Sequence, residues 1–237
     1  MKISSICAVL LAAAPLQSAF AQAPSLGLAG DFAILSGAGV TLTGSAVNGT
    51  VGTFAANGAI TLTSSPVGGS LHYGDSTALA ASTDFLAAYA TLAAMPASTC
   101  DVLLTGSLAG VSLPPGNYCF DAAATLTGVL TLDGPADAQW LFRVGTSGAG
   151  ALTGTSFSVV MSGGASACNV TWYVANAATM TTSHFKGNIL AGAAITFTGG
   201  SLVGRDLAKA GVTLTGSAVT GCAASATPSQ YPARFRR

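Results

Sequence analysis

The sequence predicts a mostly β fold, a parallel β-helix with one long α-helix packed alongside it. Two observations predict this fold. The segments 187–203 and 204–220 align without gaps, which gives a repeat of 17 residues. One stretch, from about residue 75 to residue 95, instead has the alanine-rich composition and apolar spacing of a helix. A short fixed period is typical of solenoids, in which each repeat stacks on the next one.

Each repeat contains the pattern of a short strand. A Thr-apolar-Thr triplet places its apolar residue on one side of a strand and both threonines on the other. Glycine after most triplets permits a corner. Stacked strands of this kind share one core, and their outward side chains form ladders. The candidate ladder residues are Thr41, Thr43, Thr61, Thr63, Thr125, Thr127, Thr153, Thr155, Thr179, Thr181, Thr196, Thr198, Thr213, Thr215 and Ser217.

The segment 75–95 is the exception to the strand pattern. Asp75 or Ser76 is suited to cap the start of a helix, and Pro96 stops it. We expect about five helical turns, laid along the β-helix by an apolar stripe. An interfacial membrane helix would need basic residues, which this segment lacks. The residues of the expected stripe are Leu79, Phe85, Leu86, Tyr89 and Leu92.

The first 21 residues have the features of a secretory leader. Lys2 precedes an apolar run that ends near Pro15, and Ala19-Phe20-Ala21 fits the small-x-small rule for cleavage. The run is shorter than the roughly 20 apolar residues of a membrane span. We therefore expect a secreted, extracellular chain with no membrane segment. It would consist of a β-helix domain over residues 22–224 and a flexible tail over residues 225–237.

Charged residues are scarce. They make up 7% of the 237 residues, and all eight acids are Asp. Nucleic-acid binding depends on clustered Lys and Arg, and the one basic cluster is Arg234, Arg236 and Arg237 in the tail. We therefore expect no nucleic-acid partner, and we expect a monomer.

Four cysteines remain once the leader, with Cys7, is removed. An even count in an exported chain indicates two disulfides, for which three connectivities are possible. We favour Cys100–Cys119, which would close a short loop, and Cys168–Cys222, which would tie down the last segment. A metal site is the weaker alternative, because no C-x-x-C spacing occurs and His72 and His184 lie far from the cysteines in sequence. We expect no metal and no cofactor.

An enzyme is the second functional class to consider, because β-helix folds host polysaccharide lyases and hydrolases. Such enzymes need paired carboxylates, or Arg or Lys beside an acid. Asp133 and Asp137 lie in a turn-like stretch, LDGPADAQW, which explains them without catalysis. The second group is expected at a charged corner and consists of Arg205, Asp206 and Lys209. We expect no catalytic residues.

From about Leu26 to Cys222 the chain resembles the ice-binding-like domain family, the discontinuous β-solenoid ice-binding proteins of polar microbes. The segments that carry the resemblance, in the order of the family, are LGLAGDFAILSGAGVTLTGSAVNGTVGT, LPPGNYCF, LTGVLTLDGPADAQWLFRVGT, ACNVTWYV, FKGNILAGAAITFTGG and GRDLAKAGVTLTG. The resemblance implies a right-handed β-helix with three faces, in which the N-terminal strand packs beside the C-terminal coil. The two copies of GVTLTGSAV, at Gly39–Val47 and Gly211–Val219, would then be adjacent rungs.

The resemblance also implies a function, adsorption to the surface of an ice crystal through the threonine ladders. The sequence departs from the Thr-Gly-x-Thr and Thr-Gly-x-Asn patterns of the family, since Thr43-Gly44-Ser45-Ala46, for example, ends in Ala. The alternative is an ice-inactive member that serves as a cell-surface adhesin or binds carbohydrate. Tyr73, Tyr89 and Trp172 are the candidate sugar contacts for that alternative, although the apolar strand around Trp172 favours a place in the core.

Overall fold

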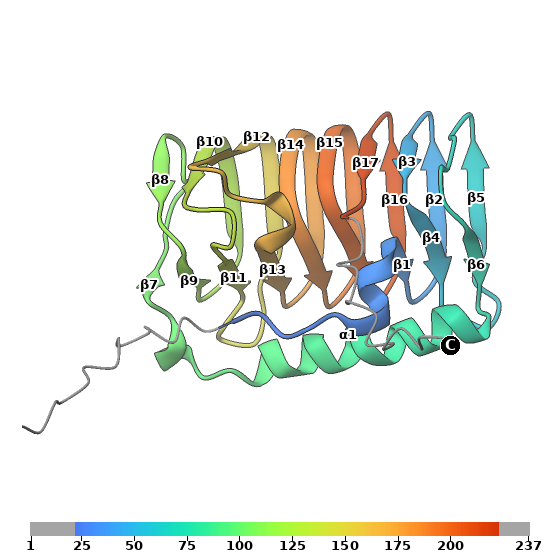
Figure 1. Ribbon diagram of the computed structural model, residues 1–237, viewed down its shortest axis with the longest axis horizontal. Coiled ribbons are helices and arrows are strands. Elements are labelled where there is room, and N and C mark those ends of the chain that lie inside the picture. The colour runs from blue at the N-terminus through green and yellow to red at the C-terminus, as the bar shows by residue number, and fades with distance from the viewer. Residues whose placement is uncertain (1–21, 223–237) are drawn as a thin grey trace, which may run out of the picture.

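The computed structural model describes residues 22–222, which form a parallel β-helix with one long helix beside it (Figure 1). The expected leader (1–21) and the whole of the expected tail (225–237), which includes the basic cluster, lie outside the described residues. The strands are β1 (Phe32–Ser36), β2 (Val40–Thr43), β3 (Ala46–Asn48), β4 (Thr50–Thr53), β5 (Ile60–Thr63), β6 (Leu71–Tyr73), β7 (Val102–Leu103), β8 (Val111–Leu113), β9 (Gly116–Phe120), β10 (Ala124–Asp133), β11 (Trp140–Val144), β12 (Leu152–Ser162), β13 (Val170–Val174), β14 (Ala178–Ala191), β15 (Ile195–Ala208), β16 (Val212–Thr215) and β17 (Ala218–Thr220). The helices are α1 (Ser76–Ala94) and three short 3-10 helices, η1 (Gly27–Asp31), η2 (Ala97–Thr99) and η3 (Ala167–Asn169).

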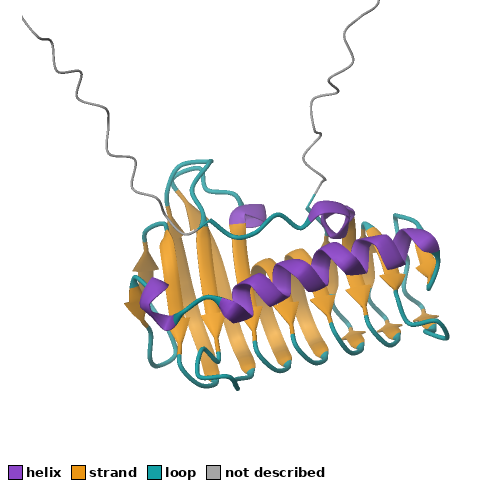
Figure 2. Cartoon of the chain, turned by 90° about the horizontal axis from the view of Figure 1, so that it is seen from below, coloured by secondary structure: helices purple, strands orange, loops and turns teal. Residues whose placement is uncertain are grey.

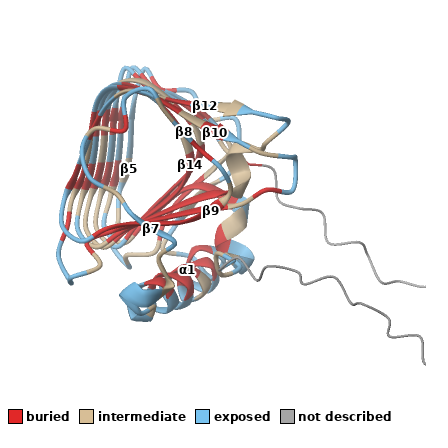
Figure 3. Ribbon diagram, turned by 90° about the vertical axis from the view of Figure 1, so that its left-hand side faces the viewer, coloured by how far each residue is buried: buried red, intermediate tan, exposed pale blue. Residues whose placement is uncertain are grey.

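The β-helix has three faces, which appear as the sides of a triangle in end view (Figure 3). The first face consists of β5, β2 and β16 and the first residues of β15, β14, β12 and β10. The second face contains β3, β17 and β8 and later parts of the long strands. The third contains β6, β4, β1, β13, β11, β9, β7 and the last residues of β15 and β14.

The coils do not follow one another in chain order, as the resemblance implied. Strand β1 lies between β15 and β4, and β2 pairs with β16. The two copies of GVTLTGSAV are therefore adjacent rungs, with Thr41 opposite Thr213 and Val47 opposite Val219. Helix α1 makes this order possible by carrying the chain from β6 back toward β7 along the third face (Figure 2). Its 19 residues span about 28 Å, or about six strand spacings.

The predicted long helix is confirmed, but its contact face differs from the expected stripe. The Asp75 carboxylate caps the start by accepting a hydrogen bond from the Ala78 N–H at 2.9 Å. Phe85, Tyr89 and Leu92 are buried, whereas Leu79 and Leu86 are 48% and 38% exposed. Small side chains take their places in the contact face, which lets the helix backbone lie close to the third face. Those small residues are Ala78, Ala81, Ser82 and Ala88.

Columns of apolar side chains fill the interior of the β-helix. Trp172 is fully buried and stacks on Phe142 with ring centroids 3.9 Å apart. This confirms the place of Trp172 in the core. Tyr89 is also buried, on the side of α1 that packs against the third face, where its hydroxyl donates a hydrogen bond to the Ala175 carbonyl at 3.0 Å. Of the three candidate sugar contacts, Tyr73 alone is exposed.

Both expected disulfides are present. Cys100–Cys119 joins the segment after α1 to β9, and Cys168–Cys222 joins η3 to the end of the described chain. Arg143 reinforces the first link, because its guanidinium is buried beneath the same segment. It donates hydrogen bonds to the Met95 and Pro96 carbonyls and to the Thr99 hydroxyl.

Removal of either disulfide is expected to lower the free energy of unfolding by an amount that grows with the logarithm of the number of residues in the loop that it closes. The two bonds span 19 and 54 residues. The chain-entropy estimate therefore gives losses of about 3 kcal/mol for Cys100→Ala with Cys119→Ala, and about 4 kcal/mol for Cys168→Ala with Cys222→Ala. Urea unfolding of the two double variants measures both losses. A larger loss from the shorter loop would contradict this ranking.

Candidate functional site

Seven rungs of the first face carry the same four-residue pattern. Each reads apolar-Thr-x-Thr, where x is Leu, Phe, Met or Gly, and the first side chain is buried in every rung except that of Ile60. The first threonines of the seven rungs pair in register from one strand to the next without a break. This column, in spatial order, is Thr61, Thr41, Thr213, Thr196, Thr179, Thr153 and Thr125.

A second column runs parallel to the first. It is in register over six rungs and ends where the pairing of β10 with β12 shifts after Leu126. Thr127 follows that shift and therefore lies beside the column rather than in it. Thr153 and Thr196 are half-buried, and the other threonines of both columns are exposed. The second column is Thr63, Thr43, Thr215, Thr198, Thr181 and Thr155. The two columns together with Thr127 are called the threonine face.

Ser217 is not part of this face, contrary to expectation. It is 3% exposed, and its hydroxyl donates hydrogen bonds to carbonyl oxygens of Gly199 and Thr215, both at 3.2 Å. Gly216 before it has a left-handed backbone (φ 62°), which turns the chain inward at the corner. Ser217 therefore replaces backbone hydrogen bonds that the corner breaks. At neighbouring corners, the hydroxyls of Ser45, Ser65 and Ser183 likewise donate to the carbonyl oxygen two residues earlier in the chain.

The sequence pattern missed three members of the hydroxyl surface. Ser64, Ser156 and Thr182 occupy the corner position directly after the second column, and all three are exposed. The hydroxyls of Ser156 and Thr182 lie 3.2 Å apart. The three residues have left-handed φ angles, 49°, 48° and 46°, at a position where other coils have glycine. Replacement of the corner glycine by a hydroxyl residue was the signal available in the sequence.

The threonine face carries no charged side chain. None of its seven strand segments contains Asp, Glu, Lys or Arg. Neighbouring rungs lie about 4.7–4.9 Å apart, and the two columns about 6.6 Å apart. Threonine is stiff at χ1, so the hydroxyls and methyls are ordered before any contact is made. The third face is covered by α1, and the second carries His184 and Lys186 among its outward residues.

The candidate catalytic groups do not assemble into a site. Arg205 and Asp206, expected at a charged corner, are instead 6% and 0% exposed and point to opposite sides of β15. Lys209 is exposed at the corner, with its ammonium 3.8 Å from the centre of the Tyr89 ring. Asp133 and Asp137 are exposed at the start of a surface loop.

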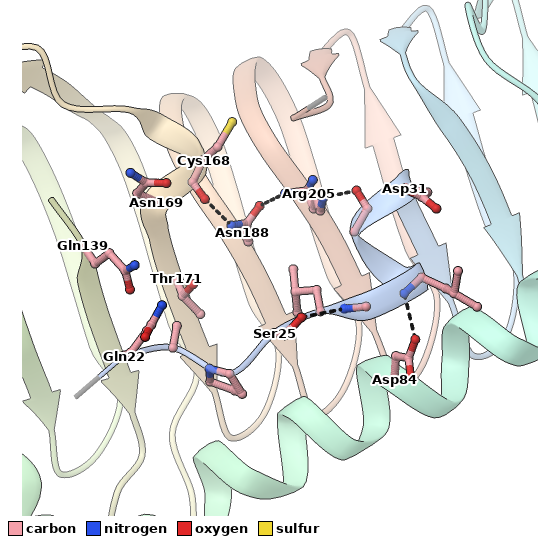
Figure 4. Close-up of a pocket in the computed structure, with 16 residues that line it drawn as sticks. Gln22, Ser25, Asp31, Asp84, Gln139, Cys168, Asn169, Thr171, Asn188 and Arg205 are labelled. Carbon is pink, nitrogen blue, oxygen red and sulfur yellow. Dashed lines mark hydrogen bonds between the residues drawn. The ribbon is translucent and has the colours of Figure 1, made fainter. Parts of the chain in front are cut away.

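A polar groove lies between the N-terminal segment and the third face (Figure 4). Arg205 spans it, donating from Nε to the Gly30 carbonyl, from Nη1 to Asn188 Oδ1, and from Nη2 to the Cys222 carbonyl. Asn188 in turn donates to the Cys168 carbonyl. These bonds tie both ends of the described chain to β14 and β15, so the groove has a structural explanation. Within residues 22–222, no group of three His, Cys, Asp or Glu side chains is arranged to hold a metal ion.

Comparison with known proteins identifies the fold and its family together. The model of the family described as ice-binding-like matches residues 34–220. The chain belongs to the ice-binding-like family. An ice-binding protein of Nostoc sp. (strain HG1) is 34% identical over 210 residues, which cover 84% of this chain and 76% of that protein. Ice-binding protein K1-A of Typhula ishikariensis is 34% identical over 216 residues, which cover 81% of this chain and 87% of that protein.

Solved structures of family members share the architecture. The crystal structure of an ice-binding protein from the Antarctic ascomycete Antarctomyces psychrotrophicus superposes with a TM-score of 0.76 at 36% identity, covering 84% of this chain and 98% of that one. The ice-binding protein LeIBP from an Arctic yeast superposes with a TM-score of 0.73 at 27% identity, covering 84% of this chain and 94% of that one. In the present chain, none of the helices within residues 22–222 is long and apolar enough to cross a membrane.

Proposed function

We propose that the chain is a secreted antifreeze protein that adsorbs to ice through the threonine face and inhibits ice growth and recrystallisation. One observation carries the proposal: the first threonines of seven rungs form an unbroken, in-register column on an uncharged surface. Family membership supports ice as the partner, and the leader-like segment 1–21 supports export.

The proposed mechanism is adsorption without catalysis. Rigid rungs at a constant spacing hold the threonine hydroxyls and methyls in a two-dimensional grid. Water on such a grid is held at fixed positions that merge with the lattice of an ice plane. Ionic hydration would disorder this water layer, which explains why charged side chains are absent from the face. Once adsorbed, the chain obstructs addition of water to the ice front beneath it.

Partition into ice tests this function directly. Purified chain beginning at Gln22 is frozen slowly onto a cold finger beside an unrelated protein of similar size. We expect the chain to enter the ice and the unrelated protein to stay in the liquid, because only a surface that binds the growing front is overgrown by it. A parallel pull-down on immobilised polysaccharides examines the adhesin alternative. Exclusion from ice together with retention on a polysaccharide would replace the antifreeze function by carbohydrate binding.

A further inference from the structure

Among residues 22–222, no segment covers the end of the β-helix formed by β5 and β6. Four side chains of this last coil point along the interior columns of the β-helix, and their partners in the next coil are Val40, Leu42, Val47 and Val51. Those partners are at most 2% exposed, whereas in the last coil Leu62 is 38% exposed and the other three side chains are partly exposed. The four residues of this surface, called the open end, are Ile60, Leu62, Val67 and Leu71.

The opposite end of the β-helix is built differently. Leu108, in the loop between β7 and β8, folds into the core, where it is 4% exposed and adopts a left-handed φ of 59°. The edge strand of the third face there, β7, has two residues, and the adjacent Asp101 places an acidic side chain at the exposed edge. Short edge strands and edge charges oppose pairing with another chain. At the open end, by contrast, the edge strand β5 has four residues, and no strand in the described part of the chain pairs with its outer side.

We propose that the open end binds the open end of a second copy of this chain, so that two chains pair about a two-fold axis. Charge favours this partner: no Asp, Glu, Lys or Arg occurs between Asp31 and Asp75, so the same surface faces itself without like-charge repulsion. An apolar cross-section of a core is complementary to another apolar surface, as in permanent dimer interfaces. Because the two ends of the molecule differ, pairing closes at the dimer and forms no filament.

The pairing has a defined consequence for the threonine face. Strand β5 is the longest free edge of the open end, so the axis passes through the first face and sets β5 antiparallel to its copy. A two-fold axis normal to that face leaves both threonine faces in one plane. The seven rungs of each chain then form one surface of twice the length. Self-association itself does not rest on the proposed function, because the open end is apolar whatever the face binds. The open end therefore changes the expectation of a monomer.

Sedimentation velocity of the chain beginning at Gln22, from about 10 μM to about 1 mM, tests the pairing. We expect a concentration-dependent dimer. Leu62→Lys places two like charges across the axis and is expected to weaken association by about 100-fold. Leu86→Lys is the matched control, because Leu86 on α1 has the same 38% exposure but lies outside the open end, and it should leave association unchanged.

Circular dichroism melting of each variant shows whether the fold is retained. Should Leu62→Lys fail to fold, Tyr73→Lys replaces it, because Tyr73 is 52% exposed and lies on the edge strand β6 of the same last coil, two residues after Leu71 and opposite Thr53. A wild-type chain that stays monomeric at about 1 mM overturns the proposal. A dimer that survives Leu62→Lys and Tyr73→Lys, or that is lost with Leu86→Lys, also overturns it, because the contact would then lie elsewhere. Ice partition plays no part in these outcomes, so failure of the antifreeze function leaves the test intact.

Discussion

Thr213→Tyr is expected to remove most of the inhibition of ice growth while leaving the fold intact. Thr213 lies on a middle rung, in register with Thr41 on one side and Thr196 on the other. A tyrosine ring there would stand above a flat surface and hold the ice front away from neighbouring rungs, so one substitution costs many contacts. Because Thr213 is exposed, the free energy of unfolding should change by only about 0.5 kcal/mol. Thermal hysteresis and recrystallisation inhibition, measured beside a circular dichroism melt, give both quantities.

Two further variants test whether the loss of activity depends on the threonine face and not on another face, and on the surface and not on the core. Thr220→Tyr introduces the same ring at an exposed threonine of β17, on the second face, and should keep the parent's activity. Leu214→Tyr alters the buried residue next to Thr213 and should destabilise the fold by about 1–3 kcal/mol through overpacking. Normal melting of Thr213→Tyr together with parental inhibition of ice growth would exclude the threonine face as the ice contact. An ice-inactive parent would leave the ladders a purely structural role.

Stability is expected to fall as pH rises from about 4 to about 8, because of a carboxyl group inside the β-helix. Asp206 is fully buried between Ile34 and Ile189, and within residues 22–222 neither of its oxygens has a hydrogen-bond partner. Burial raises the pKa of Asp206 from 3.8 to about 8. The unfolded chain releases this proton near pH 4 and the folded chain keeps it, so each pH unit between these values costs up to about 1.4 kcal/mol.

Substitution of Asp206 tests this assignment. Asp206→Asn removes the titration and should flatten the pH dependence, while Asp206→Leu should also raise stability at pH 8 by several kcal/mol, because an apolar residue suits a site between two isoleucines. Urea unfolding from pH 5 to pH 9 measures both effects. The exposed Asp75, whose pKa is lowered by the Ala78 N–H and His72, acts only at and below about pH 4, outside this window. An Asn variant with the wild-type slope would exclude Asp206 as the cause.

Periodic features were the ones that the sequence revealed. The 17-residue repeat, the alternation within each triplet and the helix after Asp75 depend on local geometry, and all three appear in the structure. Thr153 and Thr155 could be placed because they repeat the same spacing with glycine between them. The burial of Ser217 and the exposure of Leu79 and Leu86 depend instead on which side of a corner or helix meets another element.

The burial of Arg205 and Asp206 could not be predicted from the sequence, for a related reason. Strand alternation assigns Arg205 and Asp206 to opposite faces, but it does not say that both faces of this strand are covered. The N-terminal segment and α1 cover one, and the interior of the β-helix encloses the other. These contacts join residues up to 175 positions apart in the chain. The order of the coils, with β1 and β2 inserted beside β15 and β16, likewise came from family resemblance and not from the repeat.

The place of α1 has a consequence for how the chain reaches its native state. Because the helix returns the chain to the far end, the coils made after it stack back toward the N-terminal ones, and the coil that contains β16 and β17 docks between β15 and the strands β2 and β3. Folding therefore includes the closing of a seam in the middle of the molecule, between residues some 170 positions apart. Loop-closure entropy grows only with the logarithm of this separation, so the cost in stability is modest. The cost in time is larger, since non-local pairing of this kind slows folding. Until the seam closes, the nascent chain exposes two matching strand edges that a second chain could occupy, so the repeated nine-residue segment is also the place where misassembly by strand exchange begins.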